Sequence, residues 1–155
     1  MDISLYQSIV ALHVVAIAAW FGTALTFAVI GTRVRGRGDD AATVAFLGDT
    51  GWVSRAVTLP AAVVALLSGG YLMGDAKLGL GANWWLAAGI SLWLVAFLGG
   101  TMSRGAECAR ITRLAAAEEV DAEDVRWRAR RVLLLARGEL LLLAIALFLM
   151  VTQPS

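Results

Sequence analysis

The chain has 155 residues, of which 59% are hydrophobic and 16% charged, and its mean hydropathy is +0.76. A water-soluble domain of this length cannot bury so large an apolar fraction in one core, so the composition indicates a membrane protein. A net charge of +1 identifies no partner by itself, and a single cysteine, Cys108, excludes an intramolecular disulfide and a thiolate metal cluster within one copy.

Four segments are long and apolar enough to cross the hydrocarbon core of a bilayer, which is about 30 Å thick and needs roughly 20 helical residues. They cover residues 3–30, 55–73, 83–102 and 132–152. The first is expected to remain as a helix, because Asp2 precedes it in place of basic residues and no small-residue cleavage site follows it. No repeat or linker divides residues 1–155, so the sequence predicts an all-α, integral membrane four-helix bundle in a single transmembrane domain.

The region between the first and second spans is predicted to contain a short interfacial helix over residues 40–52. Gly48 and Gly51 loosen this helix, and Trp52 suits the depth of the lipid headgroups. Pro60 follows within the second span, where it removes a backbone donor. We therefore expect a bend there, unless Pro60 belongs to the first turn of the helix.

The third and fourth spans are joined by residues 103–131, which are rich in Ala, Arg and Glu and contain one glycine. This composition predicts that both helices extend beyond the membrane as an antiparallel cytoplasmic hairpin. Four of its arginines are expected to lie near anionic headgroups: Arg104, Arg128, Arg130 and Arg131. Two roles remain open for the hairpin, since it either only fixes the topology or also docks a partner subunit.

The positions of the basic residues predict the orientation in the membrane. Twelve of the 13 basic residues are arginines, and all 12 lie between the first and second spans or between the third and fourth, including the edges of those spans. The positive-inside rule places these regions in the cytoplasm, which gives a multi-pass, N-out, C-out bundle in contact with membrane lipids. This restriction to membrane edges also explains the arginines without a nucleic-acid partner.

Three ionisable side chains are expected at membrane depth, where such groups are uncommon: His13, Arg137 and Glu139. His13 is the only histidine, and it lies about 15 Å from the outer boundary, near the midplane. Its helix face also carries Trp20 and small alanines, which form either a slot for a flat ring or an ordinary packing stripe. The histidine is therefore a candidate for haem ligation or proton transfer, or a neutral donor to a neighbouring helix.

Arg137 and Glu139 are two positions apart, so they point in directions about 200° apart around the helix and cannot pair with each other. Arg137 is expected to extend to the cytoplasmic headgroups as an anchor. Glu139 is expected to face the bundle interior, either protonated or hydrogen bonded. Its depth lies within about one helical turn of His13, so a His13–Glu139 contact, direct or through water, is a hypothesis that the structure can test.

The order of the apolar motifs resembles a known group of small four-helix bacterial membrane proteins. The first span reads "LHVVAIAAWFGTALTF", the second "LPAAVVALLSGGYLM" and the third opens with "NWWLAAGISLWL". This pattern, with basic residues at the cytoplasmic entry of the fourth span, is similar to the CopD copper-resistance domain and to the HemJ-type protoporphyrinogen oxidase. The resemblance is to a functionally uncharacterised branch of that group, and it implies a multi-pass protein of the bacterial cytoplasmic (inner) membrane.

The HemJ-type resemblance implies that His13 serves haem binding or porphyrin oxidation, with haem b as the cofactor and the haem iron as the metal. Arg137 would then meet a propionate on the cytoplasmic side. The lysine associated with the third span of HemJ-type proteins is absent here, which argues against porphyrin oxidation. A CopD-like copper site would need grouped soft or imidazole ligands, and the single histidine and the scattered methionines form no such group.

Three functions follow from these residues as alternatives. The first is a haem b protein with His13 as axial ligand, Trp20, Arg137 and Glu139 around the cofactor, and a homodimer supplying a second histidine. The second is a non-catalytic accessory subunit of a larger respiratory or photosynthetic membrane complex. The third is a porphyrin- or quinone-linked oxidoreductase in which His13 and Glu139 transfer protons.

Overall fold

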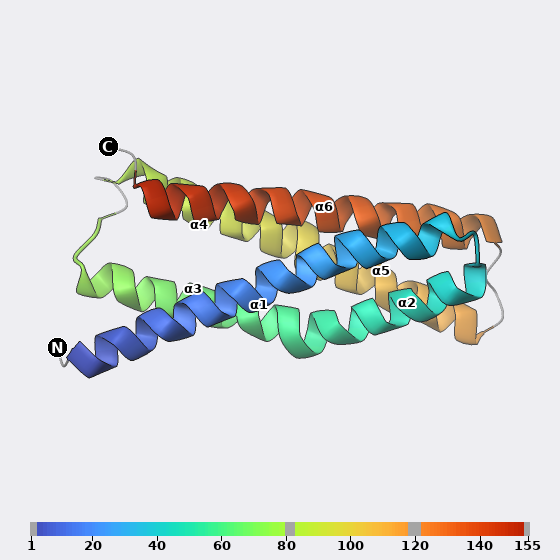
Figure 1. Cartoon of the computed structure of the whole chain (residues 1–155), viewed down its shortest axis with the longest axis horizontal. Helices are drawn as coiled ribbons and strands as arrows, with labels where there is room; N and C mark the ends of the chain where they lie inside the picture. The colour runs from blue at the N-terminus through green and yellow to red at the C-terminus, as the bar shows by residue number, and fades with distance from the viewer. Residues whose placement is uncertain (1–2, 80–82, 118–121, 154–155) are drawn as a thin grey trace.

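The chain folds into an all-helical bundle (Figure 1). The computed structural model describes residues 3–79, 83–117 and 122–153. In chain order the elements are α1 (Ile3–Gly36), α2 (Asp40–Val53), the π-helical η1 (Ser54–Thr58), α3 (Leu59–Asp75), α4 (Trp84–Val95), the π-helical η2 (Ala96–Met102), α5 (Ser103–Ala116) and α6 (Ala122–Thr152).

The eight elements make four long helices, because α2, η1 and α3 follow one another without a break, as do α4, η2 and α5. Each of the four is long and apolar enough to cross a membrane, over Leu5–Gly36, Asp40–Asp75, Trp84–Ala116 and Glu123–Thr152. The predicted number of spanning helices is therefore confirmed. At 1.5 Å per residue each helix is about 45–54 Å long, so each exceeds the hydrocarbon core by several turns.

The second long helix differs from its sequence-based prediction. A separate interfacial helix over 40–52 was expected before a span over 55–73, but α2 continues through η1 into α3. Gly51 does not interrupt the helix because it is packed against Cys108 of α5, where a built Cβ would lie 3.1 Å from the Cβ of Cys108. Packing on α5 thus outweighs the weak helical propensity of the glycines.

Pro60 lies in the first turn of α3, directly after η1. In η1 the backbone N–H of Leu59 donates to the carbonyl oxygen of Ser54, five residues earlier, so the helix is wider just before the proline. The direction of the chain changes at this point between α2 and α3 (Figure 1). Both parts of the expectation for Pro60, a bend and a place in the first turn, are met at one position.

The expected hairpin over residues 103–131 is helical as α5 and the start of α6, and its tip at 118–121 lies outside the described residues. These helices do not stand apart from the rest of the fold. α5 packs along α2, and α2 also contacts α1 and α6. The hairpin therefore continues the bundle and does not stand alone. Cys108 and Ile111 of α5 are buried against Leu47 of α2 and Val132 of α6.

Two apolar clusters fill the bundle at different heights. One contains Leu47, Cys108, Ile111, Val125, Ala129 and Val132, and it joins α2, α5 and α6. The other contains Trp20, Ala62, Ala96 and Leu143, with Trp93 and Phe97 packed against it. The ring of Trp93 meets Trp20 edge-on at 6.2 Å between centroids and stacks on Phe97 at 4.9 Å. Thr101, Arg104 and Glu139, described below, lie between these two clusters along their helices.

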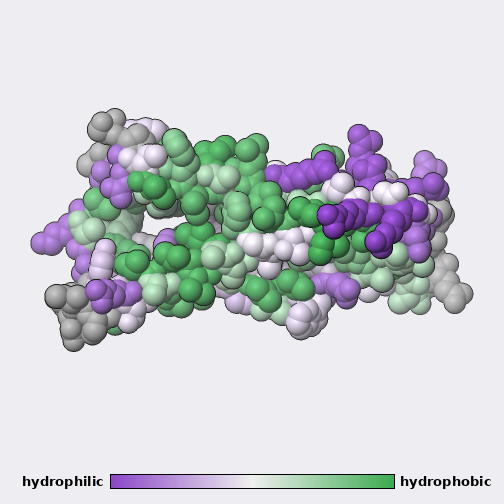
Figure 2. All heavy atoms as spheres, in the orientation of Figure 1, coloured by the Kyte–Doolittle hydropathy of each residue, from purple (hydrophilic) through white to green (hydrophobic). Residues whose placement is uncertain are grey.

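The outer surface of the bundle is largely hydrophobic along its middle, and hydrophilic residues lie toward both ends and are most numerous at one of them (Figure 2). Only 22–33% of the residues in the most apolar stretch of each long helix are buried, and outward-facing side chains such as Leu67 and Val151 are 67% and 76% exposed. Such a continuous apolar exterior is unfavourable in water and suits lipid. The arginines of α1, α5 and α6 gather at the end of the bundle opposite to the start of α1 and the end of α6.

Close contact between η2 and α6 depends on Gly100. A Cβ built on Gly100 would lie 2.7 Å from Cβ and Cγ of Glu139, whereas one built on the neighbouring Gly99 meets nothing within 4 Å. We expect Gly100→Ala to lower the free energy of unfolding by about 1–3 kcal/mol through overpacking. Gly99→Ala should be neutral or stabilising by about 0.5–1 kcal/mol, because alanine is the better helix former.

Thermal unfolding in detergent, followed by circular dichroism, measures this difference. Equal midpoints for the Gly100→Ala and Gly99→Ala proteins would contradict the close approach of η2 to α6.

Candidate functional site

His13 of α1 faces α3 and is partly buried between the two helices. Its Nδ1 atom lies 3.0 Å from Oγ of Ser68. The same hydroxyl lies 2.6 Å from the carbonyl oxygen of Val64, one turn earlier in α3, and donates its single hydrogen there. With the hydroxyl hydrogen directed to Val64, Ser68 accepts from the histidine, and we assign the proton of the neutral ring to Nδ1 on this basis.

This hydrogen bond fixes the tautomer of a neutral His13. With the proton on Nδ1, the lone pair of the ring is on Nε2. The backbone of Ala65 also hydrogen bonds with the ring, but a carbonyl oxygen is an acceptor, so no donor to the Nε2 lone pair is found among the described residues. A histidine that donates through Nδ1 and presents Nε2 is arranged as metal-ligating histidines are. Chemically, the ring can bind a metal centre or accept a proton at Nε2.

Gly69 sets the position of the imidazole. A Cβ built on Gly69 would lie 2.9 Å from Cε1 of His13, so the ring rests directly on the backbone of α3. The next residue, Gly70, has nothing within 4 Å of a built Cβ. Any side chain at position 69 would move the ring, whereas one at position 70 would not.

A second group of polar side chains surrounds Glu139 in the centre of the bundle, and we call it the Glu139 network. Its Oε1 atom accepts from Nε1 of Trp20 at 2.6 Å and from Oγ1 of Thr101 at 2.5 Å. Its Oε2 atom accepts from Nη1 of Arg104 in a short ion pair. All four side chains are between 0% and 3% exposed, so this is a buried, fully hydrogen-bonded carboxylate.

The guanidinium of Arg104 is held on its other sides as well. Nε and Nη2 each lie 3.3 Å from Oγ of Ser54, and the group stands 5.0 Å above the ring of Phe27. The network therefore takes residues from α1, η1, η2, α5 and α6, which belong to all four long helices. Both π-helical segments contribute to it, and π-helical turns often occur at functional sites.

The structure brings two of the predicted site residues together and separates the others. Trp20 and Glu139 are hydrogen bonded in the bundle interior, as expected for Glu139. His13 pairs with Ser68 instead of Glu139, so the hypothesis of a His13–Glu139 contact is wrong. The reason is that the ring of His13 points toward α3, and Glu139 meets α1 at Trp20, seven residues or about 10 Å further along.

Arg137 is exposed on the opposite side of α6 from Glu139, as the spacing predicted. Its Nη2 atom donates to Oγ1 of Thr32 near the end of α1, at 3.1 Å. Thr32 is 19 residues from His13, which is about 28 Å along the helix. A propionate of a ring bound at His13 would not reach Arg137, so the predicted meeting of the two does not fit the geometry.

Several residues of these sites were not found from the sequence, among them Arg104 and Ser68. Arg104 was expected near the headgroups with the other arginines of the hairpin, but it is fully buried. A usable signal was its place directly after the span, next to Gly100 and Thr101, with Glu139 at a matching depth on the fourth helix. Ser68 had no distinguishing signal, because a serine in a transmembrane helix often bonds only to its own backbone.

Thr101 and Thr50 offer a matched test of the Glu139 network. Both are buried, but Thr101 donates to Glu139 while Oγ1 of Thr50 has no hydrogen-bond partner among the described residues. We expect Thr101→Val to lower the free energy of unfolding by about 1.5–3 kcal/mol, the range for a hydrogen bond to a charged group. Thr50→Val should be neutral or stabilising, since it removes a hydroxyl that pays desolvation without a bond.

Denaturation of each variant and of the unaltered chain in mixed micelles gives the two changes in the free energy of unfolding. A Thr101→Val protein as stable as Thr50→Val would show that this donor is dispensable to the carboxylate.

The family described as "Predicted integral membrane protein (DUF2269)" matches residues 7–154. This covers nearly all of the 155 residues, so the chain belongs to that family. Neither the curated proteins nor the solved structures include a match to the chain. The family description agrees with the four long apolar helices: this is an integral membrane protein.

Proposed function

We propose that this member of a family of predicted integral membrane proteins binds haem b, with His13 as an axial ligand. The observation that carries the proposal is the Nδ1 bond to Ser68, which leaves the Nε2 lone pair of a half-buried imidazole for the iron. The resemblance of the first span to HemJ-type proteins points to the same residue. When bound, such a haem supplies one-electron transfer between its ferric and ferrous states.

The bundle opens toward the end where α1 begins, and His13 lies in that half of the bundle. The α1–α3 pair and the α4–α6 pair pack closely at the Glu139 network but separate toward the end where α1 begins and α6 ends. Figure 2 shows the surface hollowed between the two pairs at that end. His13 lies in this half of α1, ten residues from Ile3.

The ligand set argues for a second copy of the chain. His13 is the only histidine of the chain, so one copy offers a haem a single imidazole. A symmetric homodimer would bring two His13 side chains to one haem as a bis-histidine pair. In this proposal Trp20 and Glu139 shape the bundle beside the site, and His13, Ser68 and Gly69 hold the ligand.

The spectrum of the protein purified from a haem-replete host tests this proposal. We expect a Soret band that His13→Ala abolishes, because the iron loses its imidazole. Gly69→Ala should lower the haem content several-fold, since its Cβ displaces Cε1 of His13, while Gly70→Ala should leave the content unchanged. Ser68→Ala should retain haem but shift its reduction potential, because the imidazole loses its Nδ1 acceptor.

Absence of a Soret band, or an unchanged band in His13→Ala, would overturn the haem proposal. Migration within a large assembly in native electrophoresis would then favour the alternative, an accessory subunit of a membrane complex.

We further infer that the arginine-rich end of the bundle faces the cytoplasm, giving an N-out, C-out topology. The arginines support this orientation, and exposed aromatic side chains mark the depth of the two interfaces, which they prefer. Trp52 marks the arginine-rich side, and Tyr71 and Trp84 mark the other. Trp52 and Tyr71 are 19 residues apart on one long helix, which is about 28 Å and matches the thickness of the hydrocarbon core.

Single cysteines in a Cys108→Ala background test this orientation. We expect a membrane-impermeant maleimide to label Ala76→Cys in intact cells, and to label Ala41→Cys only after permeabilisation, because the two exposed alanines lie at opposite ends of one long helix. The reverse pattern of labelling would show that the bundle has the opposite orientation.

A further inference from the structure

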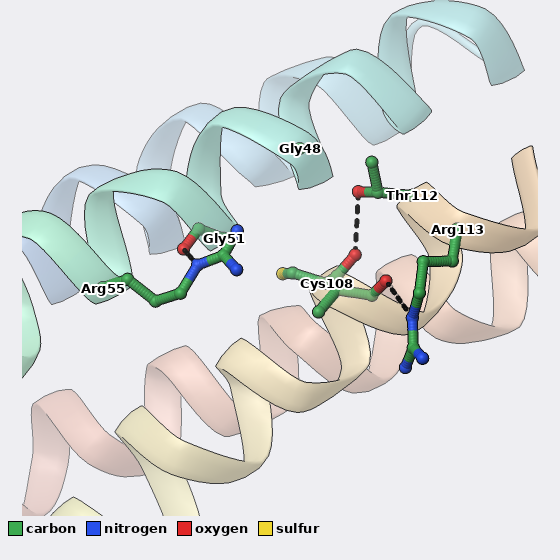
Figure 3. A pocket seen from close by; sticks show the side chains of 7 residues that line it. Gly48, Gly51, Arg55, Cys108, Thr112 and Arg113 are labelled. Carbon is green, nitrogen blue, oxygen red and sulfur yellow. Dashed lines mark hydrogen bonds between the residues drawn. The ribbon is translucent and has the colours of Figure 1, made fainter. Parts of the chain in front are cut away.

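A groove lies between α2 and α5, on the arginine-rich side of the Glu139 network (Figure 3). It has a volume of about 390 Å³. The groove exists because two glycines of α2 face α5: Gly51 is packed against Cys108, and a Cβ on Gly48 would lie 3.8 Å from Oγ1 of Thr112. Small residues thus bring the helix backbones together while leaving the space above them empty.

Two arginines flank this groove, one from each side. The Nε atom of Arg55 donates to the carbonyl oxygen of Gly51 at 3.3 Å, and that of Arg113 donates to the carbonyl oxygen of Ala109 at 3.2 Å. Each bond orients a guanidinium and leaves its Nη1 and Nη2 groups as donors. In Figure 3 the guanidinium of Arg55 extends toward Cys108, whereas that of Arg113 points away from α2, so Arg113 lines the groove from α5 and its guanidinium would have to turn to reach a ligand there.

Neither of these arginines is neutralised within the described part of the chain. Arg128 pairs with Glu107 and Asp124, Arg131 pairs with Glu107, and Arg104 pairs with Glu139, but Arg55 and Arg113 form no ion pair there. The lining of the groove contains no carboxylate. The site therefore offers positive charge and hydrogen-bond donors without a competing anion, which suits a phosphate group.

The depth of the groove identifies the kind of phosphate. Trp52, 64% exposed, lies between Gly51 and Arg55 on the same helix and is of the type found at headgroup level. Basic pockets between transmembrane helices on the cytoplasmic side are typical sites for anionic lipid headgroups. The apolar exterior next to the groove would receive the acyl chains.

We propose that the groove between α2 and α5 binds the phosphate headgroup of an anionic phospholipid, held by Arg55 and Arg113. This inference rests on the proposed membrane placement of the arginine-rich end and is independent of haem. Gly48 and Gly51 provide the room for the headgroup, and the two guanidinium groups provide its charge partners.

Native mass spectrometry of the full chain, released from micelles containing phosphatidylglycerol or phosphatidylcholine, tests the proposal. We expect phosphatidylglycerol to be retained in preference, and its retention to fall about tenfold in Arg55→Gln and in Arg113→Gln, as for the loss of one charge-assisted hydrogen bond. Arg110→Gln is the matched control, since Arg110 is an exposed arginine of α5 that does not line the groove. It should retain the lipid.

A second variant separates shape from charge. Gly48→Leu fills the groove without changing the net charge, and its Cβ has room beside Thr112. We expect it to lose the lipid while keeping the elution volume and the helical content of the unaltered protein. Equal losses in Arg110→Gln and Arg55→Gln, or full retention in Gly48→Leu, would overturn the proposal.

Competition between inorganic phosphate and the bound lipid completes the test. We expect it to leave phosphatidylglycerol bound at equal concentration, because it has no acyl chains to bury. Displacement of the lipid by inorganic phosphate would identify the groove as a free-anion site and overturn the lipid assignment. Lipid retention is measured in micelles, where the orientation of the bundle plays no part. A negative result for lipid binding can therefore be told apart from a negative result in the cysteine-labelling test of orientation.

Discussion

The arrangement of the four helices depends on one interaction, the ion pair between Arg104 and Glu139 in the centre of an apolar bundle. Removing two charges from water costs several kcal/mol per ion, so neither side chain is tolerable alone at this depth. Removing one partner of such a pair lowers the free energy of unfolding by about 3–5 kcal/mol, whereas an average hydrogen bond between membrane helices contributes about 0.6 kcal/mol. Among the contacts between these helices, the pair and its surrounding donors therefore have the largest influence on helix register.

The two π-helical segments are explained by the geometry that this network requires. Thr101 lies in η2 and Ser54 opens η1, and both act on the same ion pair from different helices. A π turn rotates and shifts the residues that follow it, so it changes which side chains face the interior without ending the helix. Gly100 completes the arrangement, because only a residue without Cβ lets η2 approach Glu139 so closely. Local widening of two helices and one glycine thus produce the burial of one carboxylate.

The sequence predicted the class of fold because hydropathy is a property of single segments. Four spans, the inward direction of Glu139 and the outward direction of Arg137 all follow from length and from the angle between neighbouring positions on a helix. The contacts of these residues depend on the registers of different helices, which no single segment determines. Depth alone suggested a His13–Glu139 contact, but rotation of α1 directs His13 to Ser68 and Trp20 to Glu139. Arg104 was assigned to the headgroups for the same reason, since the count of arginines near a span does not reveal which of them turns inward.

The polar groups of this bundle differ in how completely the protein satisfies them, and that difference separates structural from functional candidates. Both oxygens of Glu139 accept hydrogen bonds, and all three nitrogens of Arg104 donate to side chains of the bundle, so each charged atom of this network already has a partner within the protein. Nε2 of His13 and the Nη groups of Arg55 and Arg113 retain bonding capacity at positions where lipid-soluble or lipid-borne ligands have access. In a medium that offers few partners of its own, unused donors and acceptors are costly unless a ligand completes them. The same physical rule that makes the Glu139 network a structural centre therefore directs the search for function to His13 and to the groove between α2 and α5.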